Sequence, residues 1–594
     1  MDLHTYQKLI TLIRRMLDVD KPTVPVISTG SHKPDFRPLP QRLPFPVATP
    51  ESCGIASSHL ESFLHELDGD RTLDMHGISI YRHGRRLVDT AFGAYDRGVW
   101  HITYSECKSI TALAIGMLVD EGKLALSERL IDIFDRGGLS KLTHANLTVE
   151  DLLTMRSGVG MNESAAATET EWVKCFFESS VKNPGTTFHY NSINTYMLSA
   201  IVTRRTGQSL VEYLRTRLFA PLCIDNYYWE ASPEGITKAG WGLYLLPEDL
   251  AKIGQLILNG GIWKGQTLVS AAWIKQMTAK QAETPAHTGN FNYGYQTWVG
   301  RQNDCFLFNG MFGQNVIGYP ETGILIVSNA GNNELFQQSR FYQLVEDYFS
   351  RPFGDSLPED PAAQESLRRA CERLGRRAAF LEQATPSRWH RLFHPLSARR
   401  EQEQLRERME ELSGRQFVLP ADKTSSLGLM PLYMQAAQNC YSTGLCAIGF
   451  HEQEGELWCD FAEQDHTHSF AIGFELPAYT VLDFGTERHC VGVTGAFSQN
   501  EDNVPVLKLR LSFLESSHTR LIKFFFEEDG LRLRMDELPG VGCLTLAITN
   551  ATEGDNPSRL LQTVVKSKSS DVIAYLLRRA LQPEIFLPEQ EKRT

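Results

Sequence analysis

The sequence predicts an α+β protein: an antiparallel sheet flanked by helices, then a helical connector and a β-rich barrel or sandwich. Three observations lead to this class. Strand-like alternation at residues 77–93 returns only near residue 291, after a long helical stretch from residue 105. Strands at both ends of such a stretch must pair across distant parts of the chain, which favours an antiparallel sheet. From residue 417 onward, short alternating segments dominate.

Length and composition limit the remaining choices. A chain of 594 residues with 42% apolar and 22% charged residues is expected to fold around at least two cores. The net charge of -12 argues against nucleic acid as a partner. The 11 cysteines show no repeated spacing and no CxxC pair, which favours free thiols in a reducing cytosol. We therefore expect a cytoplasmic protein.

Residues 1–50 predict an N-terminal helix followed by a proline-rich, extended lead-in. Apolar residues recur at helical spacing in MDLHTYQKLITLIRRMLDVDKP, without the continuous apolar core of a secretory signal. We expect this helix to pack on the protein's own body in preference to anchoring at a membrane surface. No run approaches the roughly 20 apolar residues of a membrane span, so none is expected.

The first domain is expected over residues 51–352, where the periodicity of apolar residues changes several times. The expected elements are a hairpin turning at His83-Gly84, helices over 105–281, one strand ending at Gly300, two strands joined at 320–323, and a closing helix over 335–349.

The second half of the chain differs from the first in its composition and in its pattern of apolar residues. Residues 353–415 are rich in Arg and Glu and include REQEQLRERMEEL, which predicts a solvated helical connector. Residues 416–594 contain alternating segments such as VLKLRLSFLE, RLIKFFFEEDGLRLRMDEL and GCLTLAIT, which predict a β-rich domain. His466 and His468 share one face of a strand there, but we favour surface histidines over a metal site.

The first candidate for chemistry lies in HITYSECKSITALAIGMLV, where Ser105 stands three residues before Lys108. On a helix this spacing puts both side chains on one face, within hydrogen-bonding reach. The helix start favours the oxyanion formed when Ser105 attacks a carbonyl, and a lysine desolvated by the apolar residues that follow can act as the base for Ser105. Cys107 should project from another face as a core thiol. Taken alone, the pair fits a serine N-cap with a surface lysine better.

Support for a catalytic pair comes from segments further along the chain. PGTTFHYNSINTYMLSAI contains Tyr190-Asn191-Ser192 before a predicted helix; GWGLYLLPEDLAKIGQLILNGGIWKGQTL, YGYQTW and FNGMFGQNVIGYPETG follow in order. Together they resemble the serine β-lactamase-like family, which includes class C β-lactamases, penicillin-binding proteins and related esterases and amidases. The YNS box, the GWGLYL stretch and the Gly-Gln of GMFGQ are most similar to the 6-aminohexanoate-dimer hydrolase type. The resemblance covers roughly residues 50–350.

The resemblance implies a β-lactamase-like domain with a helical subdomain, and catalysis through an acyl-enzyme without metal or cofactor. Ser105 would attack an ester or amide carbonyl. Lys108 and Tyr190 would together serve as the base, with the division between them left open. The backbone N–H of Ser105 and one N–H near Gly310 and Met311 would form the oxyanion hole.

The substrate-binding positions depart from the family pattern. Ser192 takes the last place of the tyrosine box, and Phe308-Asn309-Gly310 stands where penicillin-recognising relatives carry Lys-Thr-Gly or His-x-Gly. Without that cation, an ester or a non-peptidic amide is favoured over a β-lactam. Asn309 and Gln314 are candidates for hydrogen-bonding the substrate instead, and Trp241 falls in a region that lines the cleft in relatives.

Three functional hypotheses follow. We favour a serine hydrolase that acts on a small-molecule ester or amide. An acyltransferase using the same acyl-enzyme stays open, because cleft shape and water access select the acceptor. A non-catalytic binding or sensor protein with this fold is the third hypothesis, and the presence of Ser105, Lys108 and Tyr190 together argues against it. The physiological substrate, the role of residues 416–594 and the oligomeric state are left open by the sequence.

Overall fold

The computed structural model describes residues 30–138, 140–163, 166, 169–302, 305–334, 339–375, 395–423, 425–438, 440–543, 575 and 578–590. Three predictions fall wholly or partly outside these residues: the N-terminal helix, the strand in GCLTLAIT beyond Cys543, and the start of the closing helix. Among the residues described, no helix combines the length and apolar character needed to cross a membrane.

The first domain is built on an antiparallel sheet with the strand order β2-β1-β12-β11-β10-β9-β8. Its strands are β1 (Met75–Arg82), β2 (Arg85–Ala91), β8 (Phe291–Tyr293), β9 (Trp298–Gly300), β10 (Phe306–Gly310), β11 (Gln314–Tyr319) and β12 (Ile324–Ala330). β1 and β12 come from opposite ends of the domain and pair next to the edge strand β2, with Ile80 opposite Ile326. This confirms the sheet predicted from strands at both ends of the helical stretch.

At two turns of this sheet, the backbone conformation of one or two residues determines where the chain reverses direction. The predicted hairpin reverses at His83 and Gly84, whose φ angles are 48° and 70°. Two successive left-handed residues give the turn whose twist matches antiparallel strands. FNYGYQTWVG, in contrast, forms β8 and β9 and not the single strand predicted. The chain reverses between them because Gln296 adopts a φ of 54°.

Helices and short strands fill the rest of this domain. They are η1 (Glu51–Cys53), α2 (Ser57–Gly69), β3 (His101–Ile102), η2 (Tyr104–Glu106), α3 (Cys107–Asp120), α4 (Leu130–Ile133), α5 (Ser140–Thr143), α6 (Val149–Leu153), α8 (Trp172–Glu178), α9 (Ser192–Thr206), α10 (Leu210–Leu214), η3 (Arg215–Phe219), β4 (Tyr227–Trp229), β5 (Leu243–Leu245), α11 (Pro247–Leu258), β6 (Ile262–Trp263), β7 (Gln266–Thr267), α12 (Ala271–Met277), η4 (Ala286–Thr288), η5 (Met311–Gly313), α13 (Arg340–Phe349) and α14 (Pro361–Leu374).

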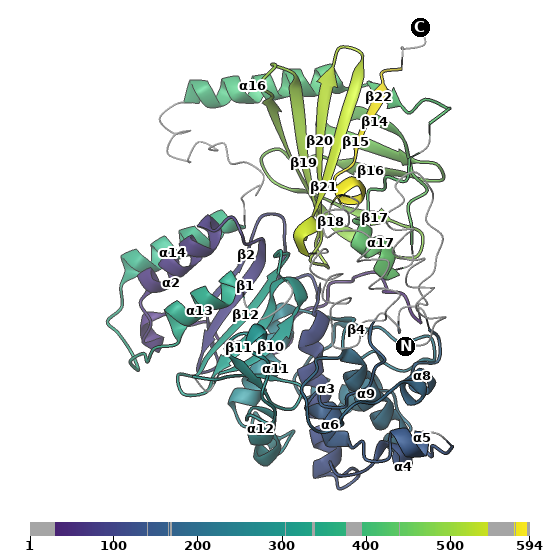
Figure 1. The fold of residues 1–594 in the computed structure, drawn as a ribbon. Helices are drawn as coiled ribbons and strands as arrows, with labels where there is room; N and C mark the ends of the chain where they lie inside the picture. Colours follow the sequence, from purple (N-terminus) through teal and green to yellow (C-terminus); the bar gives the residue numbers. More distant parts are fainter. Residues whose placement is uncertain are drawn as a thin grey trace.

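Helices cover both faces of the sheet (Figure 1). On one face, α2 and α13 share a core with β1 through Phe63, Ile78 and Phe341. On the other face, α3 and α11 share a second core with β11 and β12, which includes Leu113 and Val316. β1 and β12 are buried along their whole length, and β12, with the sequence ILIVSNA, is mostly apolar, as is typical of a strand covered on both faces.

The segment predicted as a solvated connector divides into two helices with different neighbours. Residues 361–374 form α14, which packs against α2 and buries Leu367 and Leu374 in the core that α2 shares with α13. The apolar stripe of α14 covers one side of the first domain, and the expected bounds of the connector stay a prediction. REQEQLRERMEEL is helical as predicted, within α16 (Pro395–Leu412), and α16 lies over the strands of the second domain (Figure 1).

The second domain consists of two antiparallel sheets, β13-β14-β15-β16 and β17-β18-β19-β20-β21-β22. Its elements are β13 (Gln416–Val418), α17 (Leu432–Gln438), β14 (Leu445–Gln453), β15 (Glu456–Glu463), β16 (Thr467–Ala471), β17 (Ala478–Asp483), β18 (Arg488–Gln499), β19 (Pro505–Phe513), β20 (Thr519–Glu527), β21 (Gly530–Leu538) and β22 (Glu584–Pro588). Both sheets contribute to one core, for example through Phe450 and Leu509. Isolated bridges such as Phe417 to Glu589 join their edges, and the described strands do not close into a single barrel.

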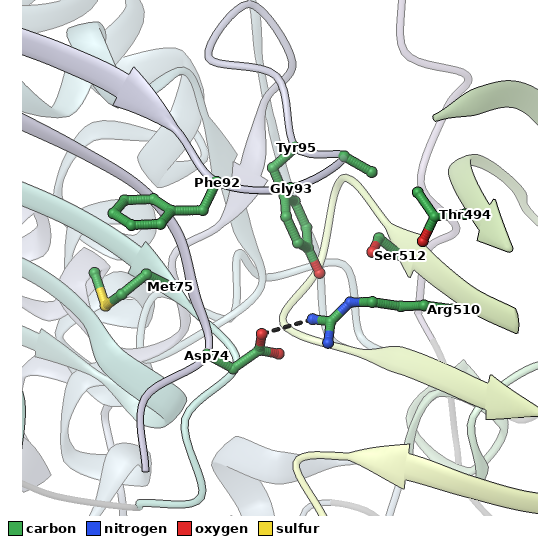
Figure 2. A pocket seen from close by; sticks show the side chains of 9 residues that line it. Asp74, Met75, Phe92, Gly93, Tyr95, Thr494, Arg510 and Ser512 are labelled. Carbon is green, nitrogen blue, oxygen red and sulfur yellow. Dashed lines mark hydrogen bonds and ion pairs between the residues drawn. The ribbon is translucent and has the colours of Figure 1, made fainter. Parts of the chain in front are cut away.

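An ion pair joins the two domains beside a small cavity (Figure 2). The Arg510 guanidinium donates to Asp74 Oδ1 at 2.6 Å, and nearby the hydroxyls of Tyr95 and Thr519 are hydrogen-bonded at 3.2 Å. Burial acts to raise the pKa of Asp74, but the charges of Arg510 and His76 outweigh it and lower that pKa to about 2. Asp74 is therefore a carboxylate at neutral pH, and the domains meet through a charged contact.

Gly116 allows α3 to approach α12 closely, which yields a test of the fold. A Cβ atom at this position would lie 2.4 Å from Trp273 Cδ1. A helix with alanine at an interior position is normally more stable than one with glycine there, by about 1 kcal/mol. We expect Gly116→Ala instead to destabilise the protein by about 1–3 kcal/mol through overpacking. Gly69→Ala is the matched control, because that helical glycine has open space around it. Equal urea midpoints for the two variants would contradict the packing argument.

Candidate active site

Ser105 lies on a constrained turn at the entrance to α3. It lies in η2, the short helix that directly precedes α3, and its side chain is partly exposed. The preceding residue, Tyr104, has a φ of 45°, a left-handed conformation that non-glycine residues seldom adopt. Thr103 anchors the turn, since both its backbone N–H and its hydroxyl donate to Leu243 O, at 2.8 and 3.0 Å. The turn therefore presents Ser105 in one fixed position.

The Lys108 ammonium is buried and directed at Ser105. Lys108 is 1% exposed, and its Nζ donates to Ser105 Oγ and to Gly240 O, each at 2.7 Å. The helical spacing of the two residues brings them together as expected. A serine hydroxyl in contact with a buried lysine is the arrangement required for a nucleophile with an adjacent proton acceptor.

Tyr190 lies on the other side of the Lys108 ammonium. Lys108 Nζ is 4.9 Å from the centroid of the Tyr190 ring, within the range of a cation–π contact. The ring is also stacked on Trp298, with centroids 5.6 Å apart and an interplanar angle of 21°. Asn191 caps α9 by accepting a hydrogen bond from Ile193 N–H at 2.9 Å, which places Tyr190 just outside the helix. The predicted residues Ser105, Lys108 and Tyr190 therefore converge.

The start of α9 also contacts the segment that supplies the second partner of Lys108. Ser192 is buried, and its backbone N–H donates to Glu163 Oε1 at 2.7 Å. A Cβ atom at Gly240 would lie 2.9 Å from Ser192 O, so a larger residue does not fit there. Ser192 thus limits the space around Gly240 and helps to place the carbonyl that holds Lys108.

Gly310 brings the end of β10 against the turn that carries the nucleophile. A Cβ atom at Gly310 would lie 2.3 Å from Thr103 O, an approach that only glycine permits. Met311 follows in η5, beyond the last pair of the β10–β11 ladder, Gly310 opposite Gln314. The segment predicted to contribute the second oxyanion-hole N–H therefore runs beside the Ser105 turn.

The side chains predicted to replace the missing cation have protein partners. Asn309 Nδ2 donates to Asn315 Oδ1 at 2.8 Å, across the ladder between β10 and β11. Gln314 is fully buried, and its Nε2 donates to Ala330 O and to Ser517 Oγ, each at 2.8 Å. These contacts give Gln314 a bracing role and lend no support to direct substrate binding by its amide.

Trp241 is partly exposed next to Gly240. Its ring stacks on Trp172 with centroids 5.6 Å apart, and Lys238 Nζ lies 5.8 Å from its centroid. Lys238 pairs with Glu230 at 2.6 Å, so its charge is already balanced by the protein. Trp241 therefore presents an aromatic surface beside Gly240, and the neighbouring Lys238 adds no free cation there.

Two further expectations concern Cys107 and the histidines. Cys107 is a core thiol, as predicted: it is fully buried, and burial raises its pKa to about 12. His466 is exposed, but His468 is buried against the Phe484 ring at 4.7 Å, so the expectation of surface histidines is wrong for His468. Among the described residues, no cluster of potential metal ligands occurs.

Two features of the site were missed from the sequence. Gly240 contributes a backbone carbonyl, which leaves no side-chain signature, although the glycines of AGWG are a weak hint. Glu106, next to the nucleophile, is fully buried, and neither carboxyl oxygen has a hydrogen-bond partner. Burial holds the pKa of Glu106 well above its ordinary value. The carboxyl is therefore kept protonated and adds no negative charge beside Ser105.

Comparisons with known proteins find one family model and several relatives that are similar to part of this chain. A family model described as Beta-lactamase matches residues 67–343. The 6-aminohexanoate-dimer hydrolase of Paenarthrobacter ureafaciens is 26% identical over 309 residues, 48% of this chain and 77% of the relative. A penicillin-binding protein homologue from Caulobacter crescentus is 18% identical with a TM-score of 0.42, covering 51% of this chain and 98% of its own. EstCE1, a hydrolase with promiscuous acyltransferase activity, is 14% identical with a TM-score of 0.42, covering 49% of this chain and 98% of its own.

Glu106 gives the site a testable pH dependence. The unfolded chain ionises this carboxyl near pH 4.5, whereas the folded protein keeps it protonated to higher pH. Folding stability therefore falls as pH rises between the two pKa values, by about 1.4 kcal/mol per pH unit. We expect Glu106→Gln to raise the urea midpoint at about pH 7.5, with the gain disappearing below the unfolded pKa.

Glu212→Gln is the control for this titration. Glu212 accepts hydrogen bonds from Ser209 in a capping box, which lowers its pKa, so its neutralisation should reduce stability at neutral pH. A Glu106→Gln midpoint equal to that of the wild type at both pH values would show that the carboxyl does not titrate as its burial requires.

Proposed function

We propose that the chain hydrolyses an ester or amide through an acyl-enzyme on Ser105, on the premise that residues 67–343 match the family model described as Beta-lactamase. The observation that carries the proposal is the 2.7 Å contact between Lys108 Nζ and Ser105 Oγ, made by a lysine that is 1% exposed. A structural serine cap would not require a buried ammonium, whereas a nucleophile requires a group that can exchange its proton.

In the proposed reaction one member of the Lys108–Tyr190 pair is in its basic form, either Lys108 as the neutral amine or Tyr190 as the phenolate. Ser105 Oγ bonds to the substrate carbonyl carbon and its proton passes to that basic group. The negative charge that develops on the carbonyl oxygen is stabilised by backbone N–H groups of Ser105 and the Gly310–Met311 segment. The pair returns the proton to the leaving alcohol or amine. Water then attacks the acyl group with the same pair as base, which restores Ser105.

The contacts around Trp241 support an uncharged group on the substrate at this side of the site. Phe308 stands where penicillin-recognising relatives carry Lys or His, and Lys238 is neutralised by Glu230. The proposed substrates are therefore neutral esters or linear amides in preference to β-lactams, whose carboxylate needs a cationic partner. The name of the relative, 6-aminohexanoate-dimer hydrolase, recommends that dimer as one amide in the test panel.

The nucleophile is tested by intact mass after exposure to a fluorophosphonate and by turnover of short p-nitrophenyl esters. We expect one adduct on the wild type and none on Ser105→Ala, with kcat reduced by at least about 10³-fold. Lys108→Met, which avoids an unpaired buried charge, should lower kcat by about 10²- to 10⁴-fold. A panel of nitrocefin, 6-aminohexanoate dimer and p-nitrophenyl esters, with and without amine acceptors, separates the substrate classes and separates hydrolysis from acyl transfer. A wild-type protein without adduct or turnover would refute the proposal.

The role of the Tyr190 hydroxyl is tested separately. Tyr190→Phe keeps the ring over Lys108 and its stack on Trp298, so folding and substrate binding should be retained. If the hydroxyl takes part in proton transfer, kcat should fall by about 10²-fold or more with little change in KM. Trp298→Phe is the control for altered ring packing. An unchanged kcat in Tyr190→Phe would assign the proton transfer to Lys108 alone.

A further inference from the structure

The turn Leu514–His518, which joins β19 to β20 in the second domain, is inserted against the candidate active site. All five residues of this turn are at most 6% exposed. We propose that this turn positions both backbone segments of the oxyanion hole, so that the second domain is a working part of the catalytic site. The inference rests on the proposed function and assigns a role to a domain that carries no recognisable chemistry of its own.

The turn first holds the segment that ends at the nucleophile. Glu515 O accepts a hydrogen bond from Ile102 N–H at 2.9 Å. The Tyr104 hydroxyl and His518 Nε2 are hydrogen-bonded at 3.2 Å. Tyr104 is the residue with the left-handed φ of 45° directly before Ser105. The second domain therefore holds Tyr104, the strained residue whose backbone conformation sets the direction of the Ser105 N–H.

The same turn holds the opposite segment, Gly310–Gly313. Ser517 Oγ accepts from Gln314 Nε2 at 2.8 Å, and the same Nε2 donates to Met311 O at 3.1 Å. The His518 ring lies edge-on to Phe312 with centroids 5.6 Å apart. Phe312 is a second strained residue, with a φ of 66°. One five-residue turn thus contacts both sides of the predicted oxyanion hole.

The turn is itself held rigidly by Glu515. Its Oε1 accepts from Trp100 Nε1 at 2.5 Å and from Lys33 Nζ at 3.1 Å, and its Oε2 accepts from Cys490 N–H at 3.2 Å. The Lys33 and Glu515 side chains are 0% and 1% exposed. Their contacts tie the lead-in, the first domain and the second domain to one carboxylate, which leaves the turn little freedom to move.

Left-handed residues such as Tyr104 and Phe312 persist only where the surroundings over-determine them. Oxyanion-hole donors must in turn be held to within a fraction of an ångström of their working positions. The 514–518 turn supplies the surroundings for both residues at once. Its loss should therefore slow acylation more than it weakens substrate binding or folding.

The test measures the rate of acylation by a fluorophosphonate, together with kcat and KM on a p-nitrophenyl ester. His518→Phe keeps a ring against Phe312 but removes the bond to Tyr104, and Ser517→Ala removes the acceptor for Gln314. We expect His518→Phe to be acylated about 10- to 100-fold more slowly than the wild type, with KM nearly unchanged. Acylation of Ser517→Ala should also be slower than that of the wild type. His518→Gln should recover part of the rate that His518→Phe loses. Tyr95→Phe is the matched control, since it removes another interdomain hydrogen bond of 3.2 Å, to Thr519, away from the Ser105 turn.

A double-mutant cycle separates positioning from general loosening of the interface. If Tyr104 and His518 act through one bond, the double variant Tyr104→Phe/His518→Phe should be no slower than the slower single variant. Urea midpoints equal to that of Tyr95→Phe would show that folding is not the cause. Acylation of His518→Phe and Ser517→Ala at the rate of Tyr95→Phe would overturn the inference while leaving the proposed function intact. A wild-type protein that is never acylated would overturn both.

Discussion

A lysine ammonium has three N–H donors and no acceptor, so a lysine can be buried only where the fold supplies partners for it. Lys108 is buried at the start of α3 and meets Ser105 Oγ, Gly240 O and the face of Tyr190. Three segments that are distant in sequence are thereby brought to one nitrogen atom. The arrangement of the candidate active site follows from satisfying this one group, because two of its partners, Ser105 and Tyr190, are also residues of the proposed chemistry.

Backbone approach is the second constraint, and two glycines make it possible. Gly240 must pass close to Ser192 for its carbonyl to reach Lys108, and Gly310 must pass close to Thr103 for the strand end to lie beside the nucleophile. A side chain at either position would separate segments that have to touch. The positions of the Gly240 carbonyl and of the end of β10 are thus set by close contacts of main-chain atoms.

The parts of this structure that sequence could predict are those decided by neighbours along the chain. Two-residue alternation and a turn at His83-Gly84 define the hairpin, and a spacing of three on a helix brings Ser105 to Lys108. Contacts across long sequence separations escaped prediction. The Gly240 carbonyl has no side-chain signature, Gln314 is turned inward because β11 is buried along its whole length, and His468 is covered by Phe484. Domain boundaries read from composition at 353–415 stay a prediction, although α14 packs within the first domain.

The charged contacts between the domains stabilise the interface less than apolar contacts of the same size would, so their role has to be sought elsewhere. Replacing a buried ion pair with apolar side chains is often neutral or stabilising, since both charges lose their hydration. The Lys33–Glu515 and Asp74–Arg510 pairs therefore do not explain why the domains adhere strongly. Charged pairs do restrict how two surfaces fit, because any slip leaves an unpaired charge in the interface. A fixed fit matters where one surface must hold atoms of the other surface in accurate positions. The proposed function requires such accuracy beside Ser105, where the 514–518 turn contacts Tyr104 and Gln314.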